Sequence, residues 1–596
     1  MINTFAKYPL YEVTKDLADV ATGRKKADLV ITNAKLVNVC THEILDNMGV
    51  AIVKGRIAYV GDPTFAIGEN TKVVDAKGMF LAPAFMDGHM HVESSMISVG
   101  EYAKAVIPHG TSGIFFDPHE ICNVLGMKGI RYMLDDAKRT PLKAMLTMPS
   151  CVPAVEGFED SGSKITAEEV KEAMTWKETV GLGEMMNFVG ITNSFDEVHA
   201  IVGETLKADK CPTGHYSIPE TDRGLNAYIA SGVRCCHESV REIDALTKMR
   251  LGMYAQLREG SAWHDLIEVS KAITNHEVDS RFANLISDDS HPRTLVDEGH
   301  LDNIVKKAIE YGIDPITAIQ MVTINVATCF HLDHEMGSIA PGKCADMVLI
   351  SDLNKCAIND VFIDGEHVAS NGKLIVSFGE YKYPSDAYNT IHLKELTKDD
   401  FVFTYNKDKV KVRCIEAIGG KTITNEAIEE LEVKNNEIQL DPNKDILKMM
   451  VFGRHLNKNS VGRGFIKGFG IKNGALAQTV GHDAHNLSVC GTNDEDMMIA
   501  ANTLIKCGGG ICVVKDKKVI SLVELPLAGL MNEIDVKIMK EKVGQLEKSW
   551  KEIGCELPSP FMTMSIIPLA VIPNLRLTNK GLVDVNKFQF VPFIVE

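Results

Sequence analysis

The chain of 596 residues lacks any run of eighteen or more apolar residues, so we expect no membrane-spanning helix. Its first 28 residues are mixed and polar, without the apolar stretch of a secretion signal. The 14 cysteines lack regular spacing, which in a long chain without such a signal predicts reduced, mostly buried thiols instead of a disulfide framework. Together these absences predict a cytoplasmic protein that does not bind membranes.

Positive charge is also in deficit. The chain has 63 Lys and Arg residues against 80 Asp and Glu residues, a net charge of −17. This balance argues against a nucleic-acid partner, because phosphate contacts need a basic face. A hydrophobic content of 45% and a charged content of 24% are typical of globular proteins, and the length predicts two to four domains.

The central part of the chain, residues 81–334, alternates strand-like and helix-like segments. GTSGIFFD, VGLGEMMN and GVRCCHES are short apolar runs, whereas EEVKEAMTW and REIDALTKM have helical spacing. Strand–helix repeats over about 250 residues are typical of a parallel sheet, and this length suits a (β/α)8 barrel. The sequence therefore predicts an α/β fold with a barrel at its centre.

Two β-rich segments flank the predicted barrel, residues 1–80 and 335–395. Each is too short for a stable sandwich of its own, so we expect them to pack together as one small β-sandwich domain. Residues 396–596 have the pattern of a further α/β domain.

The C-terminal domain contains one glycine-rich stretch, Gly508–Gly510, which follows the helical pattern DEDMMIAANTLIKC. The triplet resembles a phosphate-binding loop only weakly, and we interpret it as a helix C-cap. The segment that follows, ICVVKDKKVISLVEL, predicts a hairpin.

The most informative polar residues stand at the ends of predicted barrel strands. His89 and His91 close an apolar strand, and side chains at positions i and i+2 of a strand point the same way. This pair alone is weak, since exposed or hydrogen-bonded histidines explain it equally well. Later strand ends add further candidates: Glu184, His215, His237, Asp288 and Asp289. Such a set at the carboxyl end of a barrel predicts a metal centre.

Longer motifs extend this pattern over nearly the whole chain, including GHMHVESSM, DPHEICNVLG, DDSHP and the late GHDAHN. On these motifs the sequence resembles the amidohydrolase superfamily and, within it, the bacterial adenine deaminases. The resemblance implies that residues 396–596 form the C-terminal domain typical of adenine deaminases. The resemblance implies that His89, His91 and Asp288 hold one metal ion and that His215 and His237 hold a second. Glu184 would bridge the two ions, where many relatives use a carboxylated lysine.

The activity implied is hydrolysis of adenine to hypoxanthine and ammonia, a step of purine salvage. Two divalent ions would lower the pKa of a bridging water, and the resulting hydroxide would attack C6. Asp288 would move the proton to a ring nitrogen or to the departing amine. The imidazole and carboxylate ligands suit Mn, Fe or Zn, and the resemblance favours Mn or Fe.

Further residues near the strand ends are candidates for catalysis or for substrate binding. His119 and Glu120 follow the second strand and are candidates for proton transfer or for binding the purine edge, with helix capping around Asp117 as the alternative. The candidate substrate-binding residues are Glu93, Arg258, Glu259 and Ser261, and structural ion pairs explain the charged ones equally well.

One pair of candidates lies outside the barrel. His482 and His485, in GHDAHN, predict either a loop over the barrel mouth or an exposed surface loop.

The sequence departs from the family pattern at three places. Cys236 replaces an expected aspartate, Ser290 replaces an expected arginine, and GHYSIPET stands where GHAPGLSG is usual. The metal ligands are retained, so these departures bear on the substrate. A paralogue that deaminates another aminated heterocycle, such as a pterin or a modified purine, is therefore an alternative.

Other functions compete with deamination. A cyclic-amide hydrolase usually has a bridging lysine, so Glu184 argues against it. A catalytically silent purine-binding barrel would not need a costly polar cluster. A nucleic-acid deaminase would carry an H-x-E…P-C-x-x-C signature, which is missing. We expect a homo-oligomer that acts on a purine base.

Overall fold

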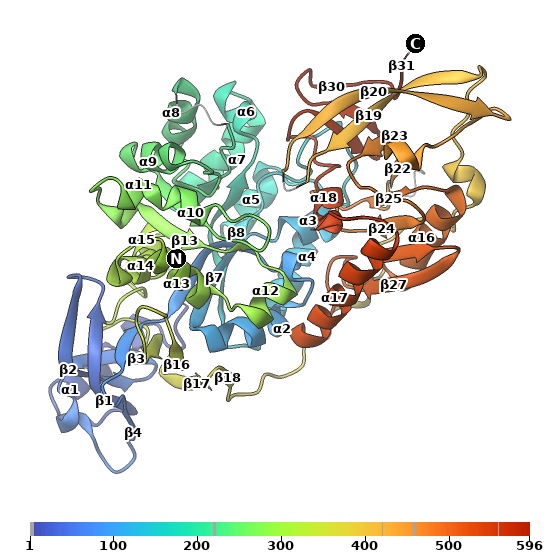
Figure 1. Cartoon of the computed structure of the whole chain (residues 1–596). Helices are drawn as coiled ribbons and strands as arrows, with labels where there is room; N and C mark the ends of the chain where they lie inside the picture. Colours follow the sequence, from blue (N-terminus) through green and yellow to red (C-terminus); the bar gives the residue numbers. More distant parts are fainter. Residues whose placement is uncertain (1–4, 219–221, 420, 457–459, 558, 596) are drawn as a thin grey trace.

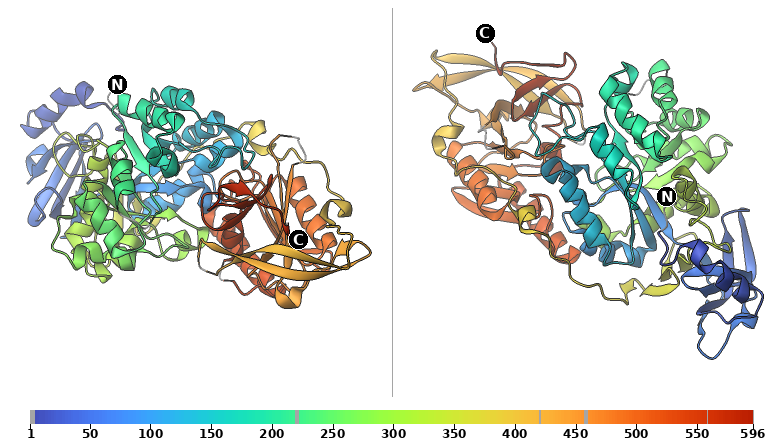
Figure 2. Two further views of the ribbon diagram at one scale, coloured as in Figure 1. Left: turned by 90° about the horizontal axis from the view of Figure 1, so that it is seen from above. Right: turned by 180° about the vertical axis from the view of Figure 1, so that it is seen from behind.

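The computed structural model describes residues 5–218, 222–419, 421–456, 460–557 and 559–595. A small β domain, a central barrel and a C-terminal α/β region follow one another (Figure 1), and two further views show the barrel between the other two parts (Figure 2). Within the described residues, no helix combines the length and the apolar character needed to cross a membrane. All 14 cysteines are free, and all but Cys40 and Cys507 are buried, as predicted.

The central barrel is a closed ring of parallel strands. Its last strand is interrupted at Ser287, and Asp288 pairs with Met90 of the first strand to close the ring. The predicted (β/α)8 barrel is therefore confirmed. In order, the strands are β6 (Phe85–His91), β7 (Thr111–Phe116), β8 (Lys143–Met148), β9 (Thr179–Met185), β10 (Cys211–Gly214), β11 (Cys235–Cys236), β12 (Tyr254–Arg258), β13 (Ala283–Ile286) and β14 (Asp288–Asp289).

Helices cover the outside of the ring, because each apolar strand is followed by a segment with helical periodicity. Local signals set the helix ends. Thr166 and Glu169 form a capping box at the start of α5, for example. The helices are α2 (Val99–Val106), α3 (His119–Leu125), α4 (Met127–Ala137), α5 (Ala167–Ala173), α6 (Phe188–Thr192), α7 (Asp196–Lys207), α8 (Arg223–Ala230), α9 (Glu242–Arg250), α10 (Leu266–Val269), α11 (Lys271–Thr274), α12 (Pro292–Asp297), α13 (Leu301–Glu310), α14 (Pro315–Met321) and α15 (Ile324–Cys329).

The two flanking segments join in one small domain, as predicted. Leu81 in β5 (Phe80–Pro83) pairs with Leu349 in β15 (Met347–Ile350), which unites them in one nine-stranded sheet. The buried Arg56 side chain adds a second link, since it donates to Glu335 Oε2 at 2.6 Å. The other elements are α1 (Leu10–Ala21), β1 (Leu29–Asn38), β2 (Glu43–Val53), β3 (Arg56–Gly61), β4 (Lys72–Asp75), β16 (Ile358–Ile363), β17 (Glu366–Ser370) and β18 (Lys373–Leu374). The domain boundaries at residues 80, 334 and 395 stay predictions.

The C-terminal region is built on a large, mainly antiparallel sheet. Its helix α16 (Asp494–Cys507) ends at Gly508, whose φ of 83° lies in the left-handed region, so the C-cap interpretation is confirmed. The hairpin prediction is also confirmed, by β26 (Gly510–Lys515) and β27 (Lys518–Glu524). The remaining strands of the sheet are β19 (Lys409–Ala417), β20 (Thr424–Lys434), β21 (Glu437–Ile438), β22 (Leu447–Phe452), β23 (Val461–Lys467), β24 (Ala475–Gln478), β25 (Leu487–Gly491) and β31 (Ile594–Val595).

The C-terminal region packs against the side of the barrel through α17 (Val536–Glu552), which contacts α12 and α2. An ion pair between Arg293 and Glu547, at 3.4 Å, lies on this contact. A short helix, α18 (Pro560–Ser565), and a three-stranded sheet of β28 (Leu575–Thr578), β29 (Gly581–Asp584) and β30 (Gln589–Phe590) complete the region. These contacts bring the C-terminal region to the carboxyl end of the barrel strands.

Candidate metal centre

The first two candidate ligands, His89 and His91, are buried at the end of β6, with ring centroids 4.8 Å apart. His91 Nδ1 donates to the backbone oxygen of Asp117 at 2.9 Å, which orients the ring so that its Nε2 faces Asp288. Nε2 of His91 and Nε2 of His89 lie 3.3 and 3.7 Å from Asp288 Oδ1. The three side chains therefore converge, and for His89 and His91 this agrees with the strand period.

Glu184 spans the two halves of the cluster from the end of β9. Its Oε1 lies 3.6 Å from His91 Nε2. Its Oε2 lies 2.5 Å from His215 Nδ1 and 3.1 Å from His237 Nε2. His215 Nδ1 and His237 Nε2 are themselves only 3.1 Å apart. One carboxylate thus faces a histidine of the first group and both histidines of the second.

The donors present fit divalent metal ions. Two groups of candidate ligands within the cluster have ligand atoms that all lie within 4.8 Å of one another: His89, His91 and Asp288, and His89, Glu184 and His237. His89 Nε2 is buried and has no hydrogen-bond partner, so it is an unpartnered candidate ligand atom inside the cluster. Buried imidazole nitrogens and carboxylates aimed at common points are the ligands that Mn, Fe and Zn accept.

Both carboxylates of the cluster are held in the charged form. Burial opposes ionisation, but the bond to His91 and the charges of His237 and Arg258 hold the pKa of Asp288 well below its usual range. His215 and His237 likewise outweigh burial and hold the pKa of Glu184 well below its usual range. Two buried carboxylate anions give the site the negative charge that a cation needs.

His119 and Glu120, in the first turn of α3, lie beside the cluster. His119 Nδ1 is 3.5 Å from Glu184 Oε1. The alternative interpretation, helix capping by Asp117, is wrong, because Pro118 occupies the N-cap and Asp117 Oδ2 accepts the backbone N–H of Glu184 at 2.7 Å. Asp117 therefore fixes the backbone of the central glutamate.

Above the cluster, a cavity of about 500 Å³ opens at the barrel mouth. Its walls come from both the barrel and the C-terminal region, and several barrel residues predicted from the sequence line it. These are His91, His119, Glu120, Glu184, His215, His237, Arg258, Asp288 and Asp289. The C-terminal region contributes an apolar wall, formed by Ile423, Ile566, Leu569, Val571, Ile572 and Pro573.

The C-terminal region also brings two polar side chains into the cavity. His482 Nδ1 lies 3.7 Å from Glu120 Oε1, and Asp483 Oδ1 lies 3.9 Å from His119 Nε2. The prediction of a loop over the mouth is confirmed for His482, whereas His485 is buried behind it and does not line the cavity. The sequence places Asp483 on this loop, between the two histidines of GHDAHN, but predicts no separate role for it.

The comparisons with known proteins agree with this geometry. Residues 80–368 match the amidohydrolase family, and residues 421–589 match the adenine deaminase C-terminal domain. The adenine deaminase of Clostridium botulinum (strain Langeland) is 62% identical over 598 residues, covering 100% of both chains. The chain belongs to the adenine deaminase family. Adenine deaminases of Moorella thermoacetica and Mesorhizobium japonicum are 48% and 43% identical, over 98% of this chain and 99% and 98% of theirs.

Two departures from the adenine deaminase pattern lie away from the cavity walls. Cys236 is buried and accepts the backbone N–H of Tyr216 at 3.2 Å, and Ser290 is buried beside the last strand. Neither lines the cavity. In the third departure, GHYSIPET, His215 and Ser217 line the cavity, while residues 219–221 lie outside the described residues.

The predicted substrate-binding residues lie in different places. Arg258 lines the cavity, but its guanidinium donates to Asp288, Glu238 and Asp265 at 3.0, 2.6 and 2.8 Å. Glu259 points away, to Lys307 Nζ at 2.9 Å.

The other two candidates are also engaged elsewhere. Ser261 Oγ donates to Thr294 Oγ1 at 2.7 Å. Glu93 accepts the backbone N–H of Ile121 at 3.2 Å, and burial together with Glu120 raises its pKa to about 8. None of Glu93, Glu259 and Ser261 lines the cavity, so the geometry gives their predicted role no support.

Proposed function

We propose that this chain hydrolyses adenine to hypoxanthine and ammonia. The observation that carries the proposal is the cluster of four histidines and two carboxylates beneath a cavity of about 500 Å³, in a chain matched along its full length by adenine deaminases. A cavity of this size suits a small heterocycle. The purine base is then the natural substrate.

Two divalent metal ions are part of the proposal. His89, His91 and Asp288 would hold one ion, His215 and His237 the other, and Glu184 would contact both. When bound, such ions act as Lewis acids and lower the pKa of a bound water. The nitrogen and oxygen donors favour Mn or Fe, with Zn as a further candidate.

Asp288 is the residue that we assign to proton transfer. It lies between His91 and Arg258, which keep it ionised and able to accept a proton from the attacking water. It delivers this proton to a ring nitrogen or to the amine as the hydroxyl adds to C6, which becomes tetrahedral. The C6 hydroxyl then loses its own proton, the C–N bond breaks, and the protonated amine leaves as ammonia. His119 and Glu120 are placed to move a second proton at the purine edge.

Recognition of the ring is divided between the two walls of the cavity. The apolar side chains of Phe188 and Ile566 are suited to pack on the faces of the ring. Asp483 and His482 present polar atoms at one side, and Asp483 Oδ2 is buried without a hydrogen-bond partner in the described structure. An orphaned carboxylate oxygen in a cavity is suited to accept an N–H of the base.

An ammonia-release screen tests the proposal. Protein loaded with Mn or Fe is incubated with adenine, its nucleosides, guanine, cytosine and pterins, and separately with hydantoins to detect ring opening. We expect ammonia from adenine at the highest kcat/KM. A higher kcat/KM for a pterin, or ring opening without ammonia, would overturn the proposal.

A further inference from the structure

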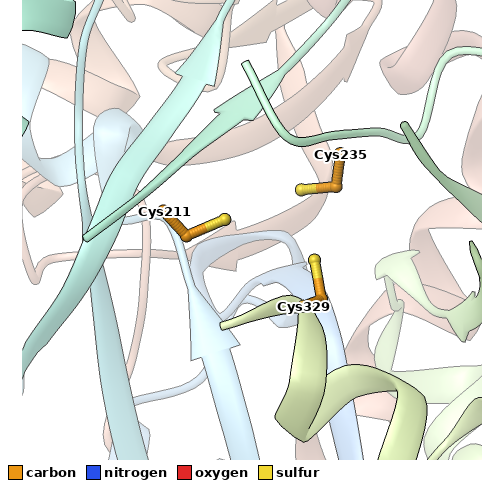
Figure 3. A group of neighbouring side chains, drawn as sticks. All are labelled: Cys211, Cys235 and Cys329. Carbon is orange, nitrogen blue, oxygen red and sulfur yellow. The ribbon is translucent and has the colours of Figure 1, made fainter. Parts of the chain in front are cut away.

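Three cysteine side chains meet inside the barrel, at the amino-terminal end of its strands. Cys211 begins β10, Cys235 begins β11 and Cys329 ends α15, and their thiols point toward one another (Figure 3). The three Sγ atoms all lie within 4.8 Å of one another, and all three residues are buried. Residues from three separate segments thus form one thiol cluster, which we call the trithiol cluster.

The trithiol cluster is distinct from the candidate metal centre. Strands β10 and β11 begin at Cys211 and Cys235 and lead to His215 and His237 at their other ends. The cluster therefore lies at the amino-terminal end of the barrel strands, where barrel enzymes place residues that serve stability. The ligands at the carboxyl end are nitrogen and oxygen donors, whereas the cluster offers sulfur alone.

The surroundings of the cluster supply positive charge. Arg234, next to Cys235, donates from Nε to the backbone oxygen of Cys329 at 2.8 Å, and its guanidinium lies 5.3 Å from the ring centre of Tyr254. Burial opposes ionisation of a thiol, but hydrogen bonds from the two other cysteines and the charge of Arg234 hold the pKa of Cys211 well below its usual range. Burial raises the pKa of Cys235 and of Cys329 well above the usual range, so Cys211 is the one thiol of the three that is favoured as a thiolate, the form that binds metals.

We propose that Cys211, Cys235 and Cys329 bind a soft cation, Zn²⁺ or Cu⁺. Thiolates are the protein ligands that such ions prefer, and three thiolates around Zn²⁺ leave one negative charge for Arg234 to balance. Each thiol that binds releases its proton to solvent. The bound ion would join β10, β11 and α15, and so would fix the two strands that carry His215 and His237.

X-ray absorption at the Zn or Cu edge tests the proposal on the full chain. The proposed catalytic ligands contain no sulfur, so sulfur around the metal reports the trithiol cluster and does not depend on activity. We expect sulfur neighbours in wild-type protein expressed with Zn²⁺ or Cu⁺ and their loss in C235S. C512S, which changes an equally buried cysteine of β26, is the matched control and should keep them.

A second measurement covers the case in which C235S does not fold. Wild-type protein freed of metal is titrated with Co²⁺, and the thiolate-to-Co²⁺ charge-transfer band is compared with that of C329A, which removes the thiol from the end of a helix instead of from a strand. We expect the charge-transfer band of the wild type to reach its full intensity at one Co²⁺ ion per chain, and we expect no such band in C329A. If the metal-loaded wild type shows no sulfur neighbours, or if C329A gives a band as strong as that of the wild type, the proposal is overturned. The three thiols would then serve only in packing of the barrel core.

Discussion

The guanidinium Nη1 of Arg258 lies 3.0 Å from Oδ2 of Asp288, the carboxylate that we assign to proton transfer. The same guanidinium also donates to Glu238 and Asp265, so three carboxylates occupy it. Little donor capacity is left for a purine nitrogen. Arg258 therefore acts as a positioning residue, which holds Asp288 in place and keeps it charged.

Replacement of Arg258 tests this positioning role. R258M should lower kcat by about 10- to 100-fold, equivalent to about 1.4–2.8 kcal/mol, because Asp288 loses its fixed partner. R258K keeps the charge but not the forked geometry, so it should recover part of the loss. Steady-state kinetics with adenine check this. A rise in KM alone, with kcat unchanged, would instead make Arg258 a substrate ligand.

Glu184 is the residue on which both halves of the metal centre depend. E184Q should lower the content of at least one metal ion, since an amide supplies no negative charge to two groups of ligands. Metal analysis of protein expressed with Mn or Fe checks this. E93Q, which changes a buried carboxylate outside the ligand cluster, is the control and should keep full occupancy. Unchanged occupancy and full activity in E184Q would refute the bridging role.

Asp288 has a separate test, because it combines metal binding and proton transfer. D288N should reduce turnover by at least about 10²-fold, the contribution expected of a general base, even in protein that retains metal. The rate per bound metal is the quantity to measure. Near-normal rates would move proton transfer to His119 or Glu120, which line the same cavity.

Asp483 provides a test of the C-terminal wall. D483N should raise the KM for adenine by about 10-fold, since a hydrogen bond to a charged group contributes about 1.5–3 kcal/mol. D399N, an exposed aspartate of the same region, is the control. If kcat falls and KM does not change, Asp483 acts through His119 and does not contact the base.

Much of this site could be predicted because strand ends in a barrel converge. His89 and His91 illustrate the rule, since the period of two places both on one side of β6. The same rule could have corrected one prediction. Arg258 ends β12 and Glu259 follows it directly, so alternation along the strand favours opposite directions for the two side chains, and Glu259 points to Lys307.

Contacts between distant segments could not be predicted in this way. Asp483 meets His119 across the docking of the C-terminal region on the barrel, in which α17 contacts α12 and α2, and no local pattern encodes that docking. The trithiol cluster was missed for the same reason: its members come from three segments, and Cys235 by itself predicts only packing.

Glu159 links stability to pH. Burial and the nearby Asp483 raise its pKa from 4.5 to about 8, so the folded chain holds this proton more tightly than the unfolded chain does. The stability that it contributes is full below about pH 4.5 and is lost as the pH rises toward 8. E159Q should therefore be more stable than the wild type by up to about 5 kcal/mol near pH 9, with a flatter pH dependence.

Urea unfolding of both proteins from about pH 6 to 9 measures this difference. E156Q, at an exposed position in the same loop, is the control and should follow the wild type. Parallel pH profiles for E159Q and the wild type would show that Glu159 is ionised in the folded protein.

The division of the cavity between two parts of the chain has a consequence for biosynthesis. All six candidate ligands lie before residue 290, whereas the apolar wall from Ile566 to Pro573 is among the last segments to be translated. Because domains fold as they emerge from the ribosome, a nascent barrel displays its ligands to the surrounding solution before that wall exists. Metal availability during synthesis, more than in the finished protein, would then decide which ions the centre receives.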